Sequence, residues 1–230
     1  MLNRFHLSSP LELGAELALE GDEFHHAVRV HRTKLGEEIE LFDGRGRGVV
    51  AAVRAIENTS MRVEVVREVL EPREPRIALE VALALIQPEK FEIVLQKATE
   101  LGAVSFIPLS TERTEVRSER VSGKEERWKK ILLEAAKQSG RLVIPTLAAP
   151  EPFEVALARP GVNVLLDPAG APSPPTGDSL RIFIGPEGGW SDEELSGAAA
   201  MGAAAWSLGH LRLRAETAAI AATALVLRRA

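Results

Sequence analysis

The fold of this 230-residue chain is decided by the stretch Leu180-Arg181-Ile182-Phe183-Ile184-Gly185-Pro186-Glu187-Gly188-Gly189-Trp190. Its first five residues form a short apolar run typical of a buried strand, and the glycines that follow favour a tight turn. The next four residues, Ser191-Asp192-Glu193-Glu194, have the Ser-x-x-Glu spacing of a helix capping box. The stretch therefore predicts a strand, a glycine turn and the start of a helix, as in α/β proteins.

The glycine turn is a candidate ligand site. Because Gly188 and Gly189 have no side chains, backbone N–H groups there can approach a ligand beside the positive end of a helix dipole. An ordinary strand-to-helix loop is the alternative interpretation of the turn taken alone. The sequence has no Gly-x-x-x-x-Gly-Lys-Ser/Thr loop, and the glycines of residues 44–48 have the wrong spacing for dinucleotide binding. Residues 44–48 are instead predicted to form a hairpin turn.

A second informative segment reads Leu208-Gly209-His210-Leu211-Arg212-Leu213-Arg214-Ala215-Glu216-Thr217-Ala218. Together with the glycine turn it resembles the ribosomal RNA uracil N3-methyltransferases of the SPOUT class, enzymes that use S-adenosylmethionine. The resemblance runs nearly end to end, because it includes Arg4-Phe5, Glu23–Val30, Lys97–Gly102, Glu112-Arg113 and Gln138–Arg141. Several independent motifs in the same order make the match specific.

The chain departs from the family pattern at two positions. The family usually reads Leu-Gly-x-Arg-Ile/Val-Leu-Arg-Thr-Glu-Thr, but here Leu211 replaces the first arginine and Ala215 the first threonine. Arg212 is the nearest substitute for the missing arginine. In an extended segment, however, a shift of one residue turns a side chain to the opposite face. The role of Arg212 is therefore left open by the sequence.

Composition is that of an ordinary globular protein, with 45% hydrophobic and 27% charged residues. No apolar run approaches the ~20 residues needed to cross a bilayer, and the N-terminus does not begin like a signal peptide, so we expect a cytoplasmic protein with no membrane partner. The absence of cysteine excludes disulfides, thiolate catalysis and Cys-ligated zinc. The clustered histidines lack metal-ligand spacing, so no metal site is predicted.

The opening segment is basic although the chain has a net charge of −5. The residues concerned are Arg4, His25, His26, Arg29, His31, Arg32 and Lys34. A solvated face neutralised by nearby acidic residues is one interpretation of this cluster, and an RNA-binding patch is the other. The family resemblance favours RNA. The predicted RNA contacts are Arg4, His25, His26, Arg29, Arg32, Arg113 and Arg141.

Two domains are predicted, with residues 1–70 forming a small β-rich domain and residues 77–230 an α/β domain. Strands are expected at Glu38–Phe42, Val49–Ile56 and Met61–Val69, and the proline-containing segment 71–76 is expected to be a stiff linker. Beyond it, strands are predicted at Ile77–Ile86, Val104–Ile107 and Val162–Leu166, with a loop at Pro168–Asp178. Helices are predicted from Pro88 to about Gly102, at Glu125–Gln138 and at Glu216–Arg228, the last with Ile220, Ala224 and Leu227 facing inward.

The family resemblance implies domain types, a cofactor and partners that the periodicity of the sequence does not show. It implies an RNA-binding PUA-like β-barrel, followed by a SPOUT methyltransferase domain whose C-terminal segment is threaded as a trefoil knot, and it implies a homodimer. It also implies S-adenosylmethionine as cofactor and 16S ribosomal RNA, within the 30S subunit, as substrate. The cofactor contacts that it implies are Leu166, Asp167, Gly185, Pro186, Glu187, Gly188, Gly189, Leu208, Gly209 and Leu213.

The proposed chemistry restricts which residues are candidates for catalysis. The methyl group of the cofactor is already activated, so its transfer mostly needs positioning. The uracil N3 proton must leave, which calls for a base or for a cation that stabilises the developing anion. The candidates are Arg214, Glu187 and Glu216. We favour Arg214 because it stays charged, whereas the two carboxylates have the alternative role of bracing loops.

Three functions are compatible with the sequence. The preferred one is the uracil N3-methyltransferase of small-subunit ribosomal RNA. The second is a SPOUT enzyme that methylates ribose 2′-hydroxyls or transfer RNA. The third is a non-catalytic RNA-binding or assembly factor, which the departures at Leu211 and Ala215 make conceivable.

Overall fold

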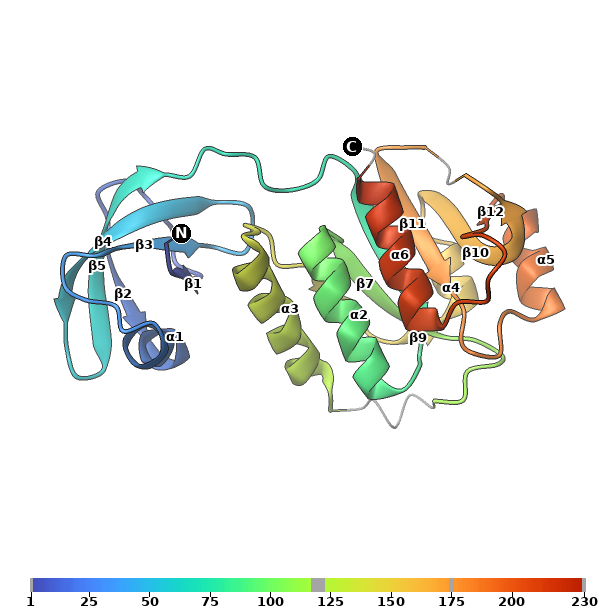
Figure 1. The fold of residues 1–230 in the computed structure, drawn as a ribbon, viewed down its shortest axis with the longest axis horizontal. Helices are drawn as coiled ribbons and strands as arrows, with labels where there is room; N and C mark the ends of the chain where they lie inside the picture. Colours follow the sequence, from blue (N-terminus) through green and yellow to red (C-terminus); the bar gives the residue numbers. More distant parts are fainter. Residues whose placement is uncertain (1, 117–122, 174–175, 229–230) are drawn as a thin grey trace. The chain divides into compact units, whose positions relative to one another are not determined.

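The computed structural model describes residues 2–116, 123–173 and 176–228, which form two compact units (Figure 1). Unit 1 contains the chain up to Glu74 together with Ala136–Ile144. Unit 2 contains Pro75–Ala135 and the chain from Pro145 onward. The first division falls inside the predicted linker 71–76, but the assignment of Ala136–Ile144 to unit 1 has no signal in the sequence.

Unit 1 is built on a five-stranded sheet with the order β1-β3-β4-β5-β2. The strands are β1 (Arg4–His6), β2 (Glu16–Glu20), β3 (Glu38–Phe42), β4 (Gly48–Ile56) and β5 (Ser60–Glu68), and all neighbours are antiparallel except the parallel pair β1 and β3. A hairpin turn was predicted at residues 44–48 and is found at residues 43–47, between β3 and β4. In it the Asp43 carboxylate accepts hydrogen bonds from the backbone N–H groups of Arg45 and Arg47. The apolar side chains of this sheet pack on Phe24 and Ala27 of helices α1 (Gly21–His25) and η1 (His26–Val30).

Two arginines that the sequence assigned to RNA are instead buried in unit 1. Arg4 pairs with Glu40 at 2.7 Å and donates to the carbonyl oxygens of Ala136, Lys137 and Arg141. The Arg141 guanidinium is 3% exposed and pairs with Glu74 at 2.7 Å. Both guanidinium groups hold residues 136–144 within unit 1, so neither is exposed in the way that the predicted RNA contact requires.

Unit 2 contains a seven-stranded sheet in which all pairs are parallel. Its order is β12-β10-β11-β6-β7-β8, and β9 also pairs with β7. The strands are β6 (Ala78–Ala84), β7 (Ser105–Ser110), β8 (Thr146–Leu147), β9 (Glu151–Pro152), β10 (Val162–Ala171), β11 (Ser179–Ile184) and β12 (Ala204–Trp206). Helices are α2 (Pro88–Leu101), α3 (Glu125–Ser139), α4 (Phe153–Leu157), α5 (Asp192–Ala200) and α6 (Ala215–Leu227). The last four residues of α3 belong to unit 1.

Helix α2 has the predicted start and end. Pro88 occupies its first turn, and Gly102 ends it in the left-handed conformation with φ 113°. Helix α6 packs on α2 and on β6, and Figure 1 shows α2 and α6 side by side. The predicted inward face of α6 is wrong in part, because Ile220 and Ala224 are only half-buried. The buried face contains Ala215, Ala219, Ala222, Thr223, Val226 and Leu227, mostly small side chains that allow close packing of the helices.

Strand β10 is longer than the sequence predicts. It runs to Ala171, although Pro168–Asp178 was predicted to be a loop. Pairing with β12 breaks between Leu166 and Ala171, so residues 167–170 form an irregular bulge in the strand. A Cβ atom at Gly170 would lie 2.5 Å from the backbone nitrogen of Trp206. The glycine thus lets the bulge lie directly against β12.

Candidate functional site

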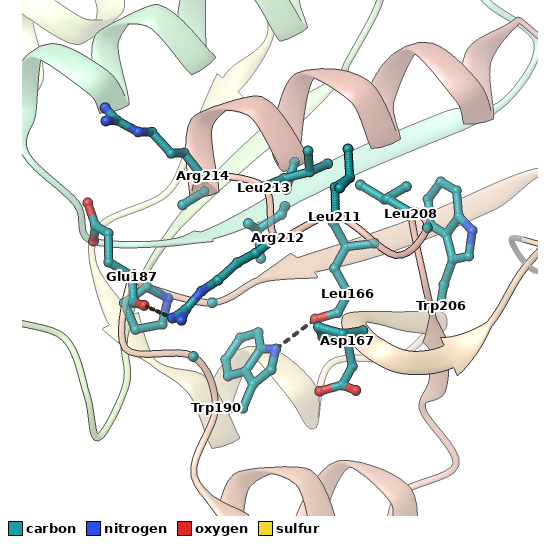
Figure 2. Close-up of a pocket in the computed structure, with 18 of the residues that line it drawn as sticks. Leu166, Asp167, Glu187, Trp190, Trp206, Leu208, Leu211, Arg212, Leu213 and Arg214 are labelled. Carbon is teal, nitrogen blue, oxygen red and sulfur yellow. Dashed lines mark hydrogen bonds between the residues drawn. The ribbon is translucent and has the colours of Figure 1, made fainter.

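Unit 2 has a cavity of about 720 Å³ at one edge of its sheet. Three segments contribute its lining: residues 166–168 in β10, residues from Ile184 at the end of β11 to Trp190, and residues from Trp206 at the end of β12 to Ala218 in α6 (Figure 2). The strands are parallel, and ligands of such sheets bind at the carboxyl ends of the strands. The volume falls within the range of about 300–1,000 Å³ that is usual for small-molecule sites.

Most of the residues predicted to hold a cofactor line this cavity. They are Leu166, Asp167, Gly185, Pro186, Glu187, Gly189, Leu208, Gly209 and Leu213. Gly188 is not one of the lining residues. A Cβ atom at Gly188 would lie 3.1 Å from Cβ of Arg113, so this glycine faces the arginine side chain. Gly189 next to it has φ 70°, a conformation that favours glycine.

Several lining residues are absent from the predicted set. They are Pro168, Ile184, Trp190, Trp206, His210, Leu211, Arg212, Ala215 and Ala218, besides the predicted catalytic residue Arg214. Trp190 follows the glycine turn directly, so proximity in sequence was a signal for it, whereas Trp206 had no such signal. Leu211 is 84% exposed and forms part of the cavity rim.

The capping box after the glycine turn also holds a neighbouring loop. Ser191 accepts a hydrogen bond from the Glu194 backbone, and the Glu194 carboxylate accepts one from the Ser191 backbone, which confirms the predicted box. The second carboxylate oxygen of Glu194 accepts from the Glu112 backbone N–H at 2.9 Å. The buried Glu194 therefore ties the start of α5 to the turn that carries Arg113.

Three cations from separate segments contact the glycine turn. Lys90 pairs with the Glu187 carboxylate at 3.0 Å. Arg212 donates to the Glu187 carbonyl oxygen at 3.1 Å, a contact drawn in Figure 2. Arg113 donates to the Gly188 carbonyl oxygen at 3.2 Å. Arg113, which was predicted to contact RNA, and Arg212, whose role the sequence left open, thus brace the turn, and Lys90 is a contact that the sequence did not indicate.

The environment of Glu187 favours its ionised form. Burial by itself would raise the pKa of this carboxyl, but hydrogen bonds from Lys90 and from its own backbone N–H, with the positive charges of Lys90 and Arg214, lower the pKa overall. A carboxylate with a lowered pKa is a poor proton acceptor at neutral pH. The geometry therefore favours a bracing role for Glu187 over proton transfer.

Arg214 and Glu216 have different positions relative to the cavity. Arg214 is exposed, precedes the first residue of α6 and lines the cavity. Its guanidinium has no hydrogen-bond or ion-pair partner among residues 2–116, 123–173 and 176–228. Glu216 does not line the cavity, and its Oε2 atom is buried with no partner in the described part of the chain. Of the three predicted catalytic residues, Arg214 and Glu187 line the cavity and Glu216 does not.

Comparison with known proteins agrees with this geometry. Residues 72–227 match the RNA methyltransferase domain, and residues 19–66 match the RNA methyltransferase PUA domain. The ribosomal RNA small subunit methyltransferase E of Synechocystis is 34% identical over 92% of this chain and 73% of its own length. That of Bacillus subtilis is 30% identical over 94% of this chain and 91% of its own length.

The chain belongs to the ribosomal RNA small subunit methyltransferase E family. Solved structures agree with this membership. The family member from Neisseria gonorrhoeae, bound to S-adenosylmethionine, has a TM-score of 0.89 at 28% identity and covers 97% of this chain and 96% of its own. A methyltransferase from Legionella pneumophila, also in complex with S-adenosylmethionine, has a TM-score of 0.88 at 30% identity and covers 100% and 98%.

As in the family, unit 1 is a PUA-like domain, and it carries four of the predicted RNA contacts, His25, His26, Arg29 and Arg32, whereas Arg113 lies in unit 2. His25, Arg29 and Arg32 are exposed. His26 is half-buried, and its Nδ1 atom lies 3.2 Å from Nζ of Lys137. Residues His26–Val30 form a π-helix, and Arg32 has φ 52°, which is unusual for a residue with a side chain. This exposed basic segment is thus held in an irregular conformation.

Within residues 2–116, 123–173 and 176–228, no group of three or more His, Cys, Asp or Glu side chains is placed to hold a metal ion. None of the helices in the same ranges is long and apolar enough to cross a membrane.

Proposed function

We propose that this chain transfers the methyl group of S-adenosylmethionine to ring nitrogen 3 of a uridine in 16S ribosomal RNA. The observation that supports it most is the convergence of the three loops on one cavity, with the unpaired Arg214 guanidinium at its rim. Family membership supports the reaction class, and the names of the relatives support the small-subunit RNA.

The cavity is suited to the cofactor in its chemistry. Leu208, Leu213 and Trp206 provide apolar surface for a flat base, and the glycine turn provides backbone groups that side chains do not cover. The first turn of α6 adds N–H groups and the positive end of a helix dipole, which favour a carboxylate. When bound, the cofactor supplies an activated methyl group on a sulfonium.

Arg214 is the residue that we assign to the developing charge. Loss of the N3 proton leaves the uracil ring anionic, and a cation at the rim of the cavity stabilises that anion. Glu187 is less suited to remove the proton, because its pKa is lowered. In paired RNA the N3 position is occupied, so the target base must be unpaired or turned out of a helix to reach the rim.

The proposal extends to the partners of the chain. The exposed residues His25, Arg29 and Arg32 of the PUA-like unit are suited to phosphate contacts. We further propose that the substrate is presented within the 30S subunit in the cytoplasm and that the enzyme acts as a homodimer with a knotted methyltransferase domain. These points rest on the family resemblance.

The test is transfer of labelled methyl groups to small ribosomal subunits that lack base methylation, followed by mass spectrometry of the nucleosides. The proposal predicts labelled 3-methyluridine. Label on a ribose 2′-hydroxyl or in transfer RNA would contradict this proposal. It would support the alternative of a SPOUT enzyme that methylates ribose or transfer RNA. Cofactor binding without methyl transfer to any RNA would contradict the proposed substrate. Absence of cofactor binding would support the non-catalytic RNA-binding function.

A further inference from the structure

The unpaired state of Arg214 needs an explanation, because a carboxylate is close to it. The charge of Arg214 contributes to the lowered pKa of Glu187, so the two groups act on one another. Figure 2 shows the Arg214 guanidinium and the Glu187 carboxylate on the same side of the cavity. No ion pair joins them in the structure, and within the described residues Arg214 pairs with no other carboxylate.

Lys90 accounts for this arrangement. It lies in the first turn of α2, and its Nζ atom is 3.0 Å from Oε1 of Glu187. The pair is partly shielded from water, with the lysine side chain 30% exposed and the glutamate side chain 45% exposed. A carboxylate that already has a close cation has less to gain from a second one. Lys90 therefore competes with Arg214 for Glu187.

We propose that Lys90 is a positioning residue that occupies the Glu187 carboxylate and so keeps Arg214 free for the anionic form of the substrate base. This inference rests on the proposed function for the identity of that anion. The position of the other contacts supports it: Arg212 and Arg113 bind the backbone carbonyls of the turn and leave the carboxylate to Lys90. The turn is thus braced without Lys90, whose charge is directed to the side chain alone.

A purely structural role for Lys90 makes different predictions. If Lys90 only held the turn in place, its loss would weaken cofactor binding, and removing the Glu187 charge as well would not help. If it keeps Arg214 free, its loss lowers kcat with little change in cofactor affinity. Removing the competing carboxylate would then restore activity. The two roles are separated by a double-variant cycle.

The experiment compares Lys90→Met, Lys90→Met/Glu187→Gln and the control Lys129→Met. Lys129 is also a lysine of unit 2 in an ion pair, with Glu125 at 2.7 Å, but it lies on α3 and does not line the cavity. Methyl transfer to RNA gives kcat, and calorimetry gives the cofactor Kd. We expect Lys90→Met to lower kcat about tenfold, because Arg214 is then drawn into an ion pair with Glu187. The double variant should have a higher kcat than Lys90→Met, because the competing carboxylate is gone. Lys129→Met should match wild type.

A crystal structure of Lys90→Met provides a readout that does not depend on activity. The inference predicts that the Glu187 carboxylate moves into an ion pair with Arg214. An unpaired Arg214 in that structure, or a double variant as slow as Lys90→Met, would overturn it. Failure of the wild type to form 3-methyluridine would contradict the proposed function instead, while the Glu187–Arg214 pairing in the variant would still decide the role of Lys90.

Discussion

Trp190 donates its indole N–H to the carbonyl oxygen of Leu166 at 3.0 Å, which joins the glycine turn after β11 to the residue of β10 that precedes the bulge. The indole also packs on Phe153, with ring centroids 4.9 Å apart. A Cβ atom at Gly185 would come within 3.1 Å of the indole, so the strand end lies directly against it. Two of the three segments that line the cavity are thereby fixed to one another.

Trp190→Phe removes the hydrogen bond to Leu166 and keeps most of the aromatic packing. A net hydrogen bond is worth about 1 kcal/mol, so we expect the cofactor Kd to rise about fivefold by calorimetry. Trp128→Phe is the control, because Trp128 stacks on Phe91 of α2 and does not line the cavity. Equal cofactor affinity in wild type and Trp190→Phe would show that the hydrogen bond between Trp190 and Leu166 is not needed for cofactor binding.

Arg214→Ala removes the unpaired cation at the cavity rim. Loss of one group that stabilises an oxyanion costs about 100- to 1,000-fold in kcat, and we expect a decrease of that size. The melting temperature should stay near that of wild type, because the side chain is exposed and has no partner within the described ranges. Arg214→Lys keeps the charge and should recover part of the activity. Wild-type turnover of Arg214→Ala in the methyl-transfer assay would end the role assigned to this residue.

Glu194→Ala leaves the backbone N–H groups of Ser191 and Glu112 without their acceptor. The cost of an unsatisfied buried donor is about 1–3 kcal/mol, and we expect the free energy of unfolding to fall by that amount in urea denaturation. Glu193→Ala, an exposed change on the same turn of α5, should have little effect. Similar losses for the two variants would argue against the link between α5 and the Arg113 turn.

Gly170→Ala tests the close approach of the β10 bulge to β12. Its Cβ atom would lie 2.5 Å from the Trp206 backbone nitrogen, and backbone must move to relieve the overlap. We expect a loss of about 1–3 kcal/mol in the free energy of unfolding. Gly197→Ala in α5 meets no atom within 4 Å and should instead gain up to about 1 kcal/mol from helix propensity. A stable Gly170→Ala variant would mean that the bulge is looser than described.

We expect the folding stability of unit 1 to depend on pH through His31. Burial lowers the pKa of His31, and the positive charges of His26 and Lys137 lower it further, against an opposing effect of Glu23. The unfolded chain then binds a proton near the ordinary pKa of 6.5 before the folded chain does, so this group costs stability as the pH falls through 6.5. NMR titration should give a pKa below 6.5, and Lys137→Met should raise it. An unchanged value in Lys137→Met would remove Lys137 as a cause.

The sequence predicted the elements whose signals are local. The hairpin at residues 43–47, the capping box of Ser191 and Glu194, and the ends of α2 depend on neighbouring residues, and all three agree with the structure. Most of the predicted cofactor contacts also line the cavity, because the family motifs fall on the loops that form it, but the motifs did not indicate lining residues such as Trp206 and Pro168.

The errors concern contacts between residues far apart in the chain. Arg4 and Arg141 were assigned to RNA by charge, but they are buried by the return of residues 136–144 to unit 1, which no local pattern indicates. The contact of Lys90 with Glu187 also spans many residues. The inner face of α6 was predicted from its larger side chains, whereas close packing on α2 selects the smaller ones.

In the proposed mechanism the cavity of unit 2 holds the cofactor with its methyl group toward Arg214. A crystal structure of the chain with S-adenosylmethionine tests it most directly. We predict the cofactor between the glycine turn and residues 208–213, with the sulfonium methyl group facing the rim that carries Arg214. A cofactor bound elsewhere, or one whose methyl group faces away from Arg214, would contradict the account.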